Sequence, residues 1–457
     1  MYSIHTFLLQ KELFRSPEPV KTSVVSSFTD TPALQQIARQ ADSDYILFYT
    51  GTSPVELHPY AIGRMYQIAE SNDGALFYSD YQEIRQGKKI HHPTLEYQTG
   101  SIRNDFDFGQ LLLFRNDSFQ QVVAQMNTDY RFAALYELRL SISRLGKIVH
   151  IPETLYTVQP TDLRLSGEKQ FDYVDPANRE VQLEMEAVCT AHLQAIGAWL
   201  APEFQRIDFG QENFAREASV IIPVRNRKRT IAEAVESALQ QQTDFSFNVI
   251  VVDNHSTDGT GQILTELSRR YPNLIHHIPA STELGIGGCW TEAILLPECG
   301  KFAIQLDSDD LYKDCHVLQR IVDTFYQENC AMVIGSYQMV DFKLEEIPPG
   351  LIAHREWTPD NGRNNALRIN GLGAPRAFYT PVLRQIKFPN VSYGEDYATA
   401  LAISRKYPIA RIYDPLYLCR RWEENSDHDL DIQQLNNYNF YKDKIRTLEI
   451  QARISGK

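Results

Sequence analysis

Three short apolar runs in the second half of the chain constrain its fold more than any other feature. They span residues 218–222, 247–252 and 302–306, and helical patterns over 230–241 and 260–270 follow the first two. Near-continuous apolar strands that alternate with helices are typical of a parallel sheet covered on both faces. We therefore predict an α/β fold in which ligands bind beyond the carboxyl ends of these strands.

A candidate ligand-binding segment follows each of the three apolar runs. Residues 223–226 follow the first run, Asp253 follows the second, and residues 307–310, with the sequence Asp-Ser-Asp-Asp, follow the third. Three carboxylates at one strand end repel one another unless a positive charge lies among them. Mg²⁺ is typically held by one or two carboxylates together with substrate phosphates. The alternative is an acidic turn that caps the next helix, and the motif alone fits both interpretations.

The first half of the chain contains a weak copy of the second half. Residues 142–156 and 403–417 are identical at seven of fifteen aligned positions, and residues 75–82 parallel residues 331–338 at the same spacing. Ordinary residue usage would give about one such identity by chance. We therefore predict two related domains in tandem.

The first copy lacks the carboxylates of the second. In the register of the repeat, the uncharged segment 50–53 falls opposite the carboxylates of 307–310, after the apolar run 45–49. Only 44 residues precede this run. We therefore expect the first copy to have the later part of the fold without its early strands, and to be non-catalytic.

Charge, cysteines and hydropathy exclude several classes of protein. The net charge of −13 argues against a nucleic-acid partner. The six cysteines are sparse and form no CxxC pair, which favours a reducing, cytoplasmic compartment. The first residues lack the pattern of a secretory signal, and no apolar run approaches the ~20 residues needed to cross a bilayer. The basic segment 438–457 is predicted to be a solvated helix, with peripheral attachment at the inner membrane face as the alternative.

Four segments, in this order, resemble the motifs of family 2 glycosyltransferases of GT-A fold: Ser219–Asn226, Val251–Thr260, Leu306–Asp310 and Tyr393–Asp396. The resemblance covers roughly residues 216–425, and the first copy resembles the same Rossmann-like fold in degenerate form. It implies transfer of a sugar, with inversion, from a nucleotide-diphosphate sugar to an acceptor hydroxyl in glycan or polysaccharide synthesis. UDP is the default nucleotide, and the acceptor is a glycan, a lipid-linked molecule or a protein.

The resemblance also implies roles for individual residues. A divalent metal, Mn²⁺ or Mg²⁺, on Asp309 would neutralise the charge that develops on the departing diphosphate. His428 is a candidate metal ligand, with a solvated loop histidine as the alternative. For Asp253 the alternative to nucleotide binding is a helix cap or an Asx turn in the polar loop 253–260. The residues expected to bind the nucleotide are Pro223, Val224, Arg225, Asn226, Asp253, Asp307 and Ser308.

Inversion requires a base on the face of the sugar opposite the leaving group. Glu395 and Asp396 open a helical run, where acidic residues are also favoured simply by the helix dipole. The family pattern assigns the base to the aspartate, so Asp396 is the predicted base and Glu395 the alternative. Ala134 and Leu135 stand opposite them in the first copy, which therefore lacks the base as well as the metal carboxylates.

The chain departs from the family pattern in one segment. Trp290 and Thr291 stand where an Arg-Asn pair often follows the glycines, so a cation that could hold the diphosphate is missing. The glycines at 285, 287 and 288 permit close backbone approach or form a plain turn. Arg420 or Arg421 could meet the diphosphate instead, with surface arginines as the alternative. Residues 354–376 are a candidate acceptor loop or a simple surface excursion.

The expected organisation has four parts: a degenerate domain over 1–165, a connecting helix and linker over 166–215, a catalytic domain over 216–425 and a helical extension over 426–457. The first domain could shape the acceptor site, bind a polymeric acceptor or mediate self-association into a homo-oligomer. Two other functions remain possible for the whole chain. One is a non-catalytic nucleotide-sugar or glycan-binding scaffold, and the other is a nucleotidyltransferase, although the first strand is not followed by the Gly-rich loop such enzymes need.

Overall fold

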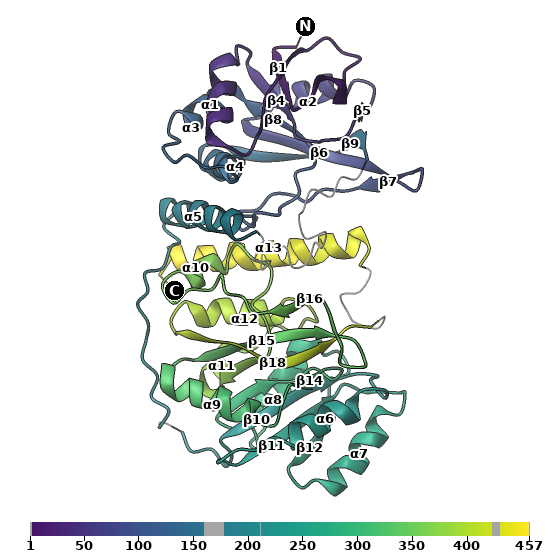
Figure 1. The fold of residues 1–457 in the computed structure, drawn as a ribbon, viewed down its shortest axis with the longest axis vertical. Coiled ribbons are helices and arrows are strands. Elements are labelled where there is room, and N and C mark those ends of the chain that lie inside the picture. Colours follow the sequence, from purple (N-terminus) through teal and green to yellow (C-terminus); the bar gives the residue numbers. More distant parts are fainter. Residues whose placement is uncertain (1, 160–177, 211, 423–429, 457) are drawn as a thin grey trace. The chain divides into compact units, whose positions relative to one another are not determined.

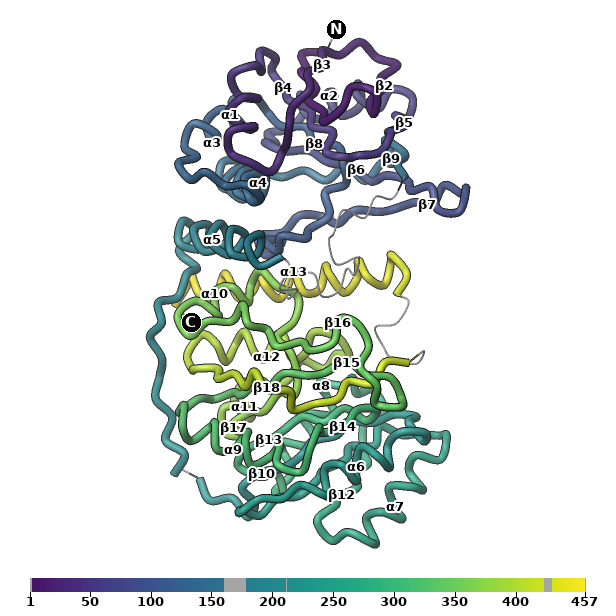
Figure 2. The backbone as a smooth tube through the Cα atoms, in the orientation of Figure 1, coloured from purple at the N-terminus to yellow at the C-terminus, as the bar shows by residue number. Residues whose placement is uncertain are grey.

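The computed structural model describes residues 2–159, 178–210, 212–422 and 430–456 (Figure 1). The chain divides into two compact units. Unit 1 comprises Met1–Trp199, Leu367–Ile369 and Leu430–Lys457, and unit 2 comprises Leu200–Ala366 and Asn370–Asp429. The chain therefore leaves unit 1, builds unit 2 and returns to unit 1 at its end, a path that Figure 2 shows as the colour passes from purple through green to yellow.

Unit 2 is built on one mixed sheet with the order β12-β11-β10-β13-β17-β15-β18-β14, and β16 pairs with β15. Its strands are β10 (Ala218–Val224), β11 (Phe247–Asp253), β12 (Leu274–His277), β13 (Phe302–Gln305), β14 (Leu311–Tyr312), β15 (Met332–Val340), β16 (Glu346–Ile352), β17 (Arg376–Tyr379) and β18 (Ile409–Arg420). Its helices are α6 (Ile231–Leu239), α7 (Thr260–Arg270), α8 (Ile286–Leu295), α9 (Val317–Glu328), α10 (Gly362–Asn365), α11 (Thr380–Ile386) and α12 (Glu395–Ser404).

The predicted α/β fold is confirmed, with one difference in the sheet. The strands β12, β11, β10 and β13 are parallel, as their apolar sequences predict. The next strand, β17, runs antiparallel to β13. The parallel half of the sheet therefore ends at β13, whose carboxyl end leads into residues 307–310.

In the part of the chain that the structure describes, unit 1 repeats seven neighbouring strands of this sheet in the same order, without a counterpart of β12. The order β3-β1-β4-β8-β6-β9-β5 corresponds to β11-β10-β13-β17-β15-β18-β14, and β7 pairs with β6 as β16 pairs with β15. Its strands are β1 (Ile4–Leu8), β2 (Phe14–Arg15), β3 (Lys21–Val24), β4 (Tyr45–Tyr49), β5 (Val55–Leu57), β6 (Gly74–Arg85), β7 (Lys88–His92), β8 (Leu111–Arg115) and β9 (Lys147–Val158). Its helices are η1 (Lys11–Leu13), α1 (Thr31–Gln40), α2 (Ala61–Glu70), α3 (Asn116–Val123), α4 (Ala134–Leu145), α5 (Arg179–Ala195) and α13 (Ile432–Ile454).

The expectation that unit 1 lacks the early strands is wrong. Strands β1 and β3 are parallel neighbours beside β4, in the places that β10 and β11 take beside β13. What unit 1 lacks is the intervening chain, because η1 and β2 replace α6 and a single helix, α1, replaces the segment from α7 to α8. Short connections left room for these strands in the 44 residues before Tyr45.

The two units share the register that the sequence repeat predicts. Tyr81 pairs with Tyr156 in unit 1 as Tyr337 pairs with Tyr417 in unit 2, and a register shift precedes each pair. In the same way β4 and β8 begin their pairing at Tyr45 and Arg115, and β13 and β17 at Phe302 and Tyr379. Five residues further along, the position of Asp307 is therefore taken in unit 1 by Thr50.

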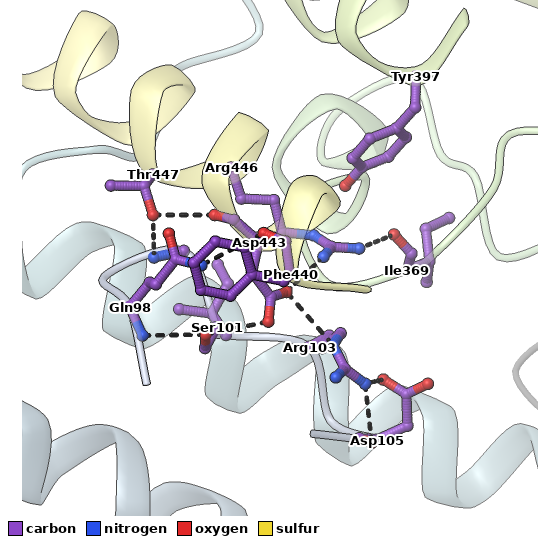
Figure 3. Close-up of polar contacts among 12 residues, drawn as sticks. Gln98, Ser101, Arg103, Asp105, Ile369, Tyr397, Phe440, Asp443, Arg446 and Thr447 are labelled. Atoms are coloured by element: carbon purple, nitrogen blue, oxygen red, sulfur yellow. Dashed lines mark hydrogen bonds and ion pairs between the residues drawn. The ribbon is translucent and has the colours of Figure 1, made fainter. Parts of the chain in front are cut away.

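The C-terminal helix α13 belongs to unit 1 and is not the solvated helix that its basic residues predict. Asp443 and Arg446 are at most 1% exposed. Arg446 Nη1 donates to Asp443 Oδ1 at 2.8 Å, Ser101 Oγ donates to the other carboxylate oxygen at 3.0 Å, and Arg103 Nε lies 3.3 Å from Oδ1 (Figure 3). The charges are buried because they neutralise one another. Among the described residues, no helix combines the length and the apolarity that a bilayer crossing requires.

Substituting Asp443 by alanine should destabilise unit 1 by about 3–5 kcal/mol, because the change leaves two buried arginines without their shared carboxylate. Urea unfolding followed by tryptophan fluorescence and circular dichroism measures the loss. Lys444→Ala, on the exposed face of the same helix, is the matched control and should change the free energy of unfolding by less than about 0.5 kcal/mol. Equal stabilities of the two variants would show that the buried pair has no net role.

A histidine of unit 1 makes its stability depend on pH. His92 Nε2 lies 2.9 Å from Asp107 Oδ2 and His92 Nδ1 lies 3.6 Å from Glu83 Oε1. Burial opposes protonation of the ring, but the hydrogen bonds to Asp107 and Glu83 and the charges of these carboxylates outweigh it and raise the pKa of His92 to about 9. The imidazolium thus stabilises the folded state.

The sign of the pH dependence follows from the raised pKa. The stabilisation by His92 is complete below its unfolded pKa of about 6.5 and disappears as the pH rises through about 9. We expect unit 1 to lose up to about 3 kcal/mol over this range, measured as the free energy of unfolding against pH. His92→Gln should remove the slope and the exposed His91→Gln should keep it. A slope unchanged in His92→Gln would contradict this assignment.

Candidate active site

Three polar segments of unit 2 meet at one edge of its sheet. Val224 pairs with Asp253 between β10 and β11, and Ile221 pairs with Gln305 between β10 and β13. Residues 225–226 and 307–310 therefore extend beyond neighbouring strand ends, and Pro223, Val224 and Asp253 are the last residues of β10 and β11.

The loop after β10 is tied by its backbone to the loop after β11. Asn226, with a φ of 55°, donates its N–H to Ser256 Oγ at 2.9 Å, and its Oδ1 accepts from Thr257 N at 2.8 Å. Val224 O accepts a hydrogen bond from Asn254 N at 2.8 Å. Val224 and Asn226 thus shape the wall of the site, and the side chain of Arg225 is exposed.

Asp253 is buried at the end of β11, with one carboxylate oxygen in a local turn. Its Oδ1 accepts from Ser256 N at 2.9 Å, and its Oδ2 lies 3.3 Å from His276 Nε2. Burial opposes ionisation, but the hydrogen bonds from His276 and Ser256 outweigh it and hold the pKa of Asp253 below its ordinary value. The turn that was the alternative for Asp253 is therefore present, and the carboxylate is an ionised acceptor.

The carboxylates after β13 do not cap the next helix. Helix α9 begins at Val317 and its N-cap is His316, six residues beyond Asp310, so the capping interpretation is wrong. Asp310 instead accepts a hydrogen bond from Arg420 N at 2.8 Å. Asp307 donates its N–H to Tyr417 Oη at 2.9 Å. Both aspartates thus fix the strand end against β18.

Negative charge accumulates at this strand end. Burial, and then the charge of Asp307, raises the pKa of Asp309. Burial and the charges of Asp309 and Asp307 raise the pKa of Asp310 well above its ordinary value. Around Asp309 Oδ2, Trp422 Nε1 donates at 3.1 Å and Arg227 Nε lies 3.8 Å away. The site is therefore one where additional positive charge is favourable.

These residues fit a divalent cation that takes most of its ligands from a substrate. Among the residues that the structure describes, no group of three or more His, Cys, Asp or Glu side chains is arranged to hold a metal alone. Mg²⁺ is commonly held by one or two carboxylates plus phosphate oxygens and water, and Asp309 offers such a carboxylate. The second candidate ligand, His428, lies outside the described residues.

The predicted base, Asp396, lies in the first turn of helix α12. Gly394, with a φ of 78°, is the N-cap, and Glu395 and Asp396 stand in the first turn. Arg376, at the start of β17, forms an ion pair with Asp396 through Nη1. The arginine holds this carboxylate in place.

A buried glutamine connects the two acidic positions. Gln305 Oε1 accepts from the backbone N and from Nε of Arg376, at 3.1 and 2.9 Å, and Gln305 Nε2 donates to Asp307 Oδ1 at 2.8 Å. Asp307, Gln305, Arg376 and Asp396 thus form a continuous hydrogen-bonded chain. Sequence analysis missed Gln305, although a lone amide in an apolar strand was the available signal.

The glycine-rich segment positions the helix of the predicted base. Gly287 N donates to Val391 O at 2.9 Å, and a Cβ on Gly287 would lie 2.0 Å from Pro389 O. The glycines therefore allow α8 to approach the loop that precedes α12. Trp290 is part of the core, with its ring 5.7 Å from Phe378 and 5.2 Å from Phe388.

Two further candidates are buried rather than surface features. Arg420 is 1% exposed, donates through Nε to Asp309 O and pairs with Glu233. In the candidate acceptor loop, His354 and Glu356 are buried and His354 Nδ1 lies 2.7 Å from Glu356 Oε1. Arg420 is therefore not a surface arginine, and the buried His354 and Glu356 do not fit a simple surface excursion.

Comparison with known proteins places unit 2 in a family. The family described as Glycosyl transferase family 2 matches residues 219–386. An uncharacterized glycosyltransferase of Nostoc sp. is 32% identical over 123 residues, which are 27% of this chain and 37% of the relative. Poly(ribitol-phosphate) beta-glucosyltransferase of Bacillus spizizenii is 24% identical over 230 residues, which are 49% of this chain and 35% of the relative. The chain thus spans little more than a third of these two relatives.

Two other proteins are similar over more of their own length. A putative teichuronic acid biosynthesis glycosyltransferase of Bacillus subtilis is 26% identical over 195 residues, 42% of this chain and 74% of the relative. The crystal structure of S. aureus TarS 1–349 in complex with UDP-GlcNAc aligns with 52% of this chain and 72% of its own, at 23% identity and a TM-score of 0.41. Residues 219–386, nearly all of them in unit 2, thus form a domain of the family described as Glycosyl transferase family 2.

Proposed function

We propose that unit 2 is an inverting, metal-dependent glycosyltransferase that moves a sugar from a UDP-sugar to an acceptor hydroxyl in the synthesis of a cell-wall polysaccharide. The observation that carries the proposal is the hydrogen-bonded chain from Asp307 through Gln305 and Arg376 to Asp396. It connects the carboxyl end of β13, where ligands bind in such sheets, to Asp396 in the first turn of α12, ten residues beyond the part of unit 2 that matches the family.

The proposed reaction uses these residues in a single displacement. Asp253 accepts a hydrogen bond from the nucleobase of the donor, and Asp307 and Ser308 contact its ribose. A divalent cation on Asp309 would supply positive charge next to the diphosphate. Asp396 takes the proton of the acceptor hydroxyl while the acceptor oxygen bonds to the anomeric carbon. The bond from that carbon to the diphosphate breaks on the opposite face of the sugar.

The acceptor class is proposed from the relatives. The names of two of them refer to poly(ribitol-phosphate) and to teichuronic acid, which are polymers with many hydroxyl groups. We propose that unit 1 is non-catalytic, because Thr50 stands in the place of Asp307 and Ala134 and Leu135 open helix α4 as Glu395 and Asp396 open α12.

Calorimetry with UDP, with and without Mn²⁺, tests the donor part of the proposal. We expect UDP to bind more tightly when Mn²⁺ is present, and Asp309→Asn to remove the difference. The control substitution Asp314→Asn removes a carboxylate that is in an exposed ion pair with Arg320, and it should preserve the difference. No binding of UDP or of any other nucleoside diphosphate would favour the scaffold interpretation for the whole chain.

A further inference from the structure

Helix α8 offers no cation to a diphosphate. The positions where the family often has an Arg-Asn pair are occupied by Trp290, which is buried between two phenylalanines, and by Thr291, whose hydroxyl donates to Gly287 O at 3.0 Å. The glycines before them are in contact with the loop that precedes α12. A diphosphate held near Asp309 therefore needs positive charge from another part of unit 2.

Three arginines gather around two aromatic rings next to Asp309. Arg229 Cζ lies 4.7 Å from the ring centre of Phe342 and 5.4 Å from that of Trp422. Arg227 Cζ lies 5.7 Å from the Trp422 ring, and Arg420 Cζ lies 5.0 Å from the Phe342 ring. The two rings are in edge-to-face contact at 5.3 Å. We call these five residues the arginine–aromatic cluster.

The members of the cluster are not equivalent. Arg420 is buried and is held by Glu233 and by the backbone of Asp309. Arg227 and Arg229 lie on the loop between β10 and α6, and their side chains reach solvent. Arg227 Nε is 3.8 Å from Asp309 Oδ2, a distance that is long for a hydrogen bond. The same guanidinium donates through Nη1 to Asn226 O at 3.2 Å.

The aromatic rings hold the half-buried Arg227 and the exposed Arg229 beside the same indole ring. A guanidinium over a ring face is attracted to the ring, and its side chain is held in one orientation. Trp422 is also fixed by its hydrogen bond to Asp309 Oδ2. The cluster thus presents two preorganised cations beside the carboxylate expected to carry a metal, and a guanidinium donates in a fork that matches phosphate oxygens.

We propose that Arg227 and Arg229, held on Trp422 and Phe342, bind the diphosphate of the donor and supply the cation that α8 lacks. The inference rests on the proposed function and adds to it. When the donor binds, Arg227 exchanges its contact with Asp309 for a phosphate oxygen, so Asp309 becomes available to the divalent cation. The same chemistry could bind phosphodiesters of a polymeric acceptor, and the test distinguishes the two sources.

The test compares ligands that differ only in phosphate. The dissociation constants of UDP, UMP and uridine are measured by calorimetry in Mn²⁺ for the full chain and for Arg227→Gln, Arg229→Gln and Lys228→Gln. A hydrogen bond to a charged group contributes enough for each arginine variant to lose about 10–100-fold in UDP affinity while its uridine affinity stays the same. Lys228→Gln removes the same charge from the same loop outside the cluster and should leave both affinities unchanged. Arg227→Lys should lose less UDP affinity than Arg227→Gln.

The outcomes separate the inference from the proposed function. If the parent protein binds neither UDP nor another nucleoside diphosphate, the proposed function fails. If the parent prefers UDP over uridine and Arg227→Gln with Arg229→Gln keeps that preference, the inference fails even though the function stands. If the variants instead raise only the KM for a phosphodiester acceptor, the cluster serves the acceptor and the inference is overturned. Equal melting temperatures of all variants exclude a folding defect as the cause.

Discussion

Replacing Asp396 by asparagine is expected to lower kcat for sugar transfer by about 10²–10⁴-fold, the usual contribution of a positioned general base. The amide has nearly the same shape as the carboxylate and can still accept from Arg376, so the helix start and its contacts should survive. What is lost is the ability to take the acceptor proton. Donor binding should therefore be almost unchanged, and initial rates together with UDP calorimetry measure the two effects separately.

Glu395→Gln is the matched comparison for this prediction. Glu395 precedes Asp396 in the same helical turn and is the alternative base. If Glu395→Gln abolishes transfer and Asp396→Asn transfers at the parent rate, the base is Glu395 and the contact of Arg376 with Asp396 is only structural. The pH profile adds a second readout, because a lost base removes the acidic limb of kcat.

Asp309→Ala should reduce kcat/KM by about 10³-fold or more, since it removes the carboxylate proposed to hold the cation that stabilises the charge of the leaving diphosphate. Neither neighbour can replace it, because Asp310 accepts from the Arg420 backbone and Asp307 accepts from Gln305. The loss should appear in turnover and in the Mn²⁺ dependence of UDP binding, measured together.

Although Asp309→Ala should lose activity, it should not lose stability. The pKa of Asp309 is raised by burial and by the charge of Asp307, so the ionised side chain disfavours the folded state as the pH rises above that pKa. Removing it should leave the melting temperature at pH 8 unchanged or higher. A variant that loses activity because it unfolds would contradict the assignment of Asp309 to function.

Local patterns predicted much of this fold, and contacts between distant segments were the part that they could not supply. The apolar runs predicted the strands of unit 2. The rule that parallel strands end at one edge of the sheet predicted that Asp253 and Asp307 lie at the same edge. The repeat predicted that Thr50 stands in the place of Asp307. These inferences need only neighbouring residues and one geometric rule.

The remaining features depend on pairings across long stretches of sequence. The link from Gln305 to Arg376 exists because β17 runs antiparallel beside β13, which no local pattern indicates. The burial of α13 depends on Arg103, which lies 340 residues before Asp443, so its basic residues looked like a solvated face. The early strands of unit 1 were missed because their connections are much shorter than those of unit 2.

The most direct test of the central claim is nucleotide release from a panel of UDP-, GDP- and dTDP-sugars by the full chain, in Mn²⁺ and with a cell-wall polymer as acceptor. We expect release from a UDP-sugar that requires the acceptor and the metal and that is lost in Asp396→Asn. Release that is equally fast in Asp396→Asn, or the absence of release from every sugar by a protein that still binds UDP, would contradict it.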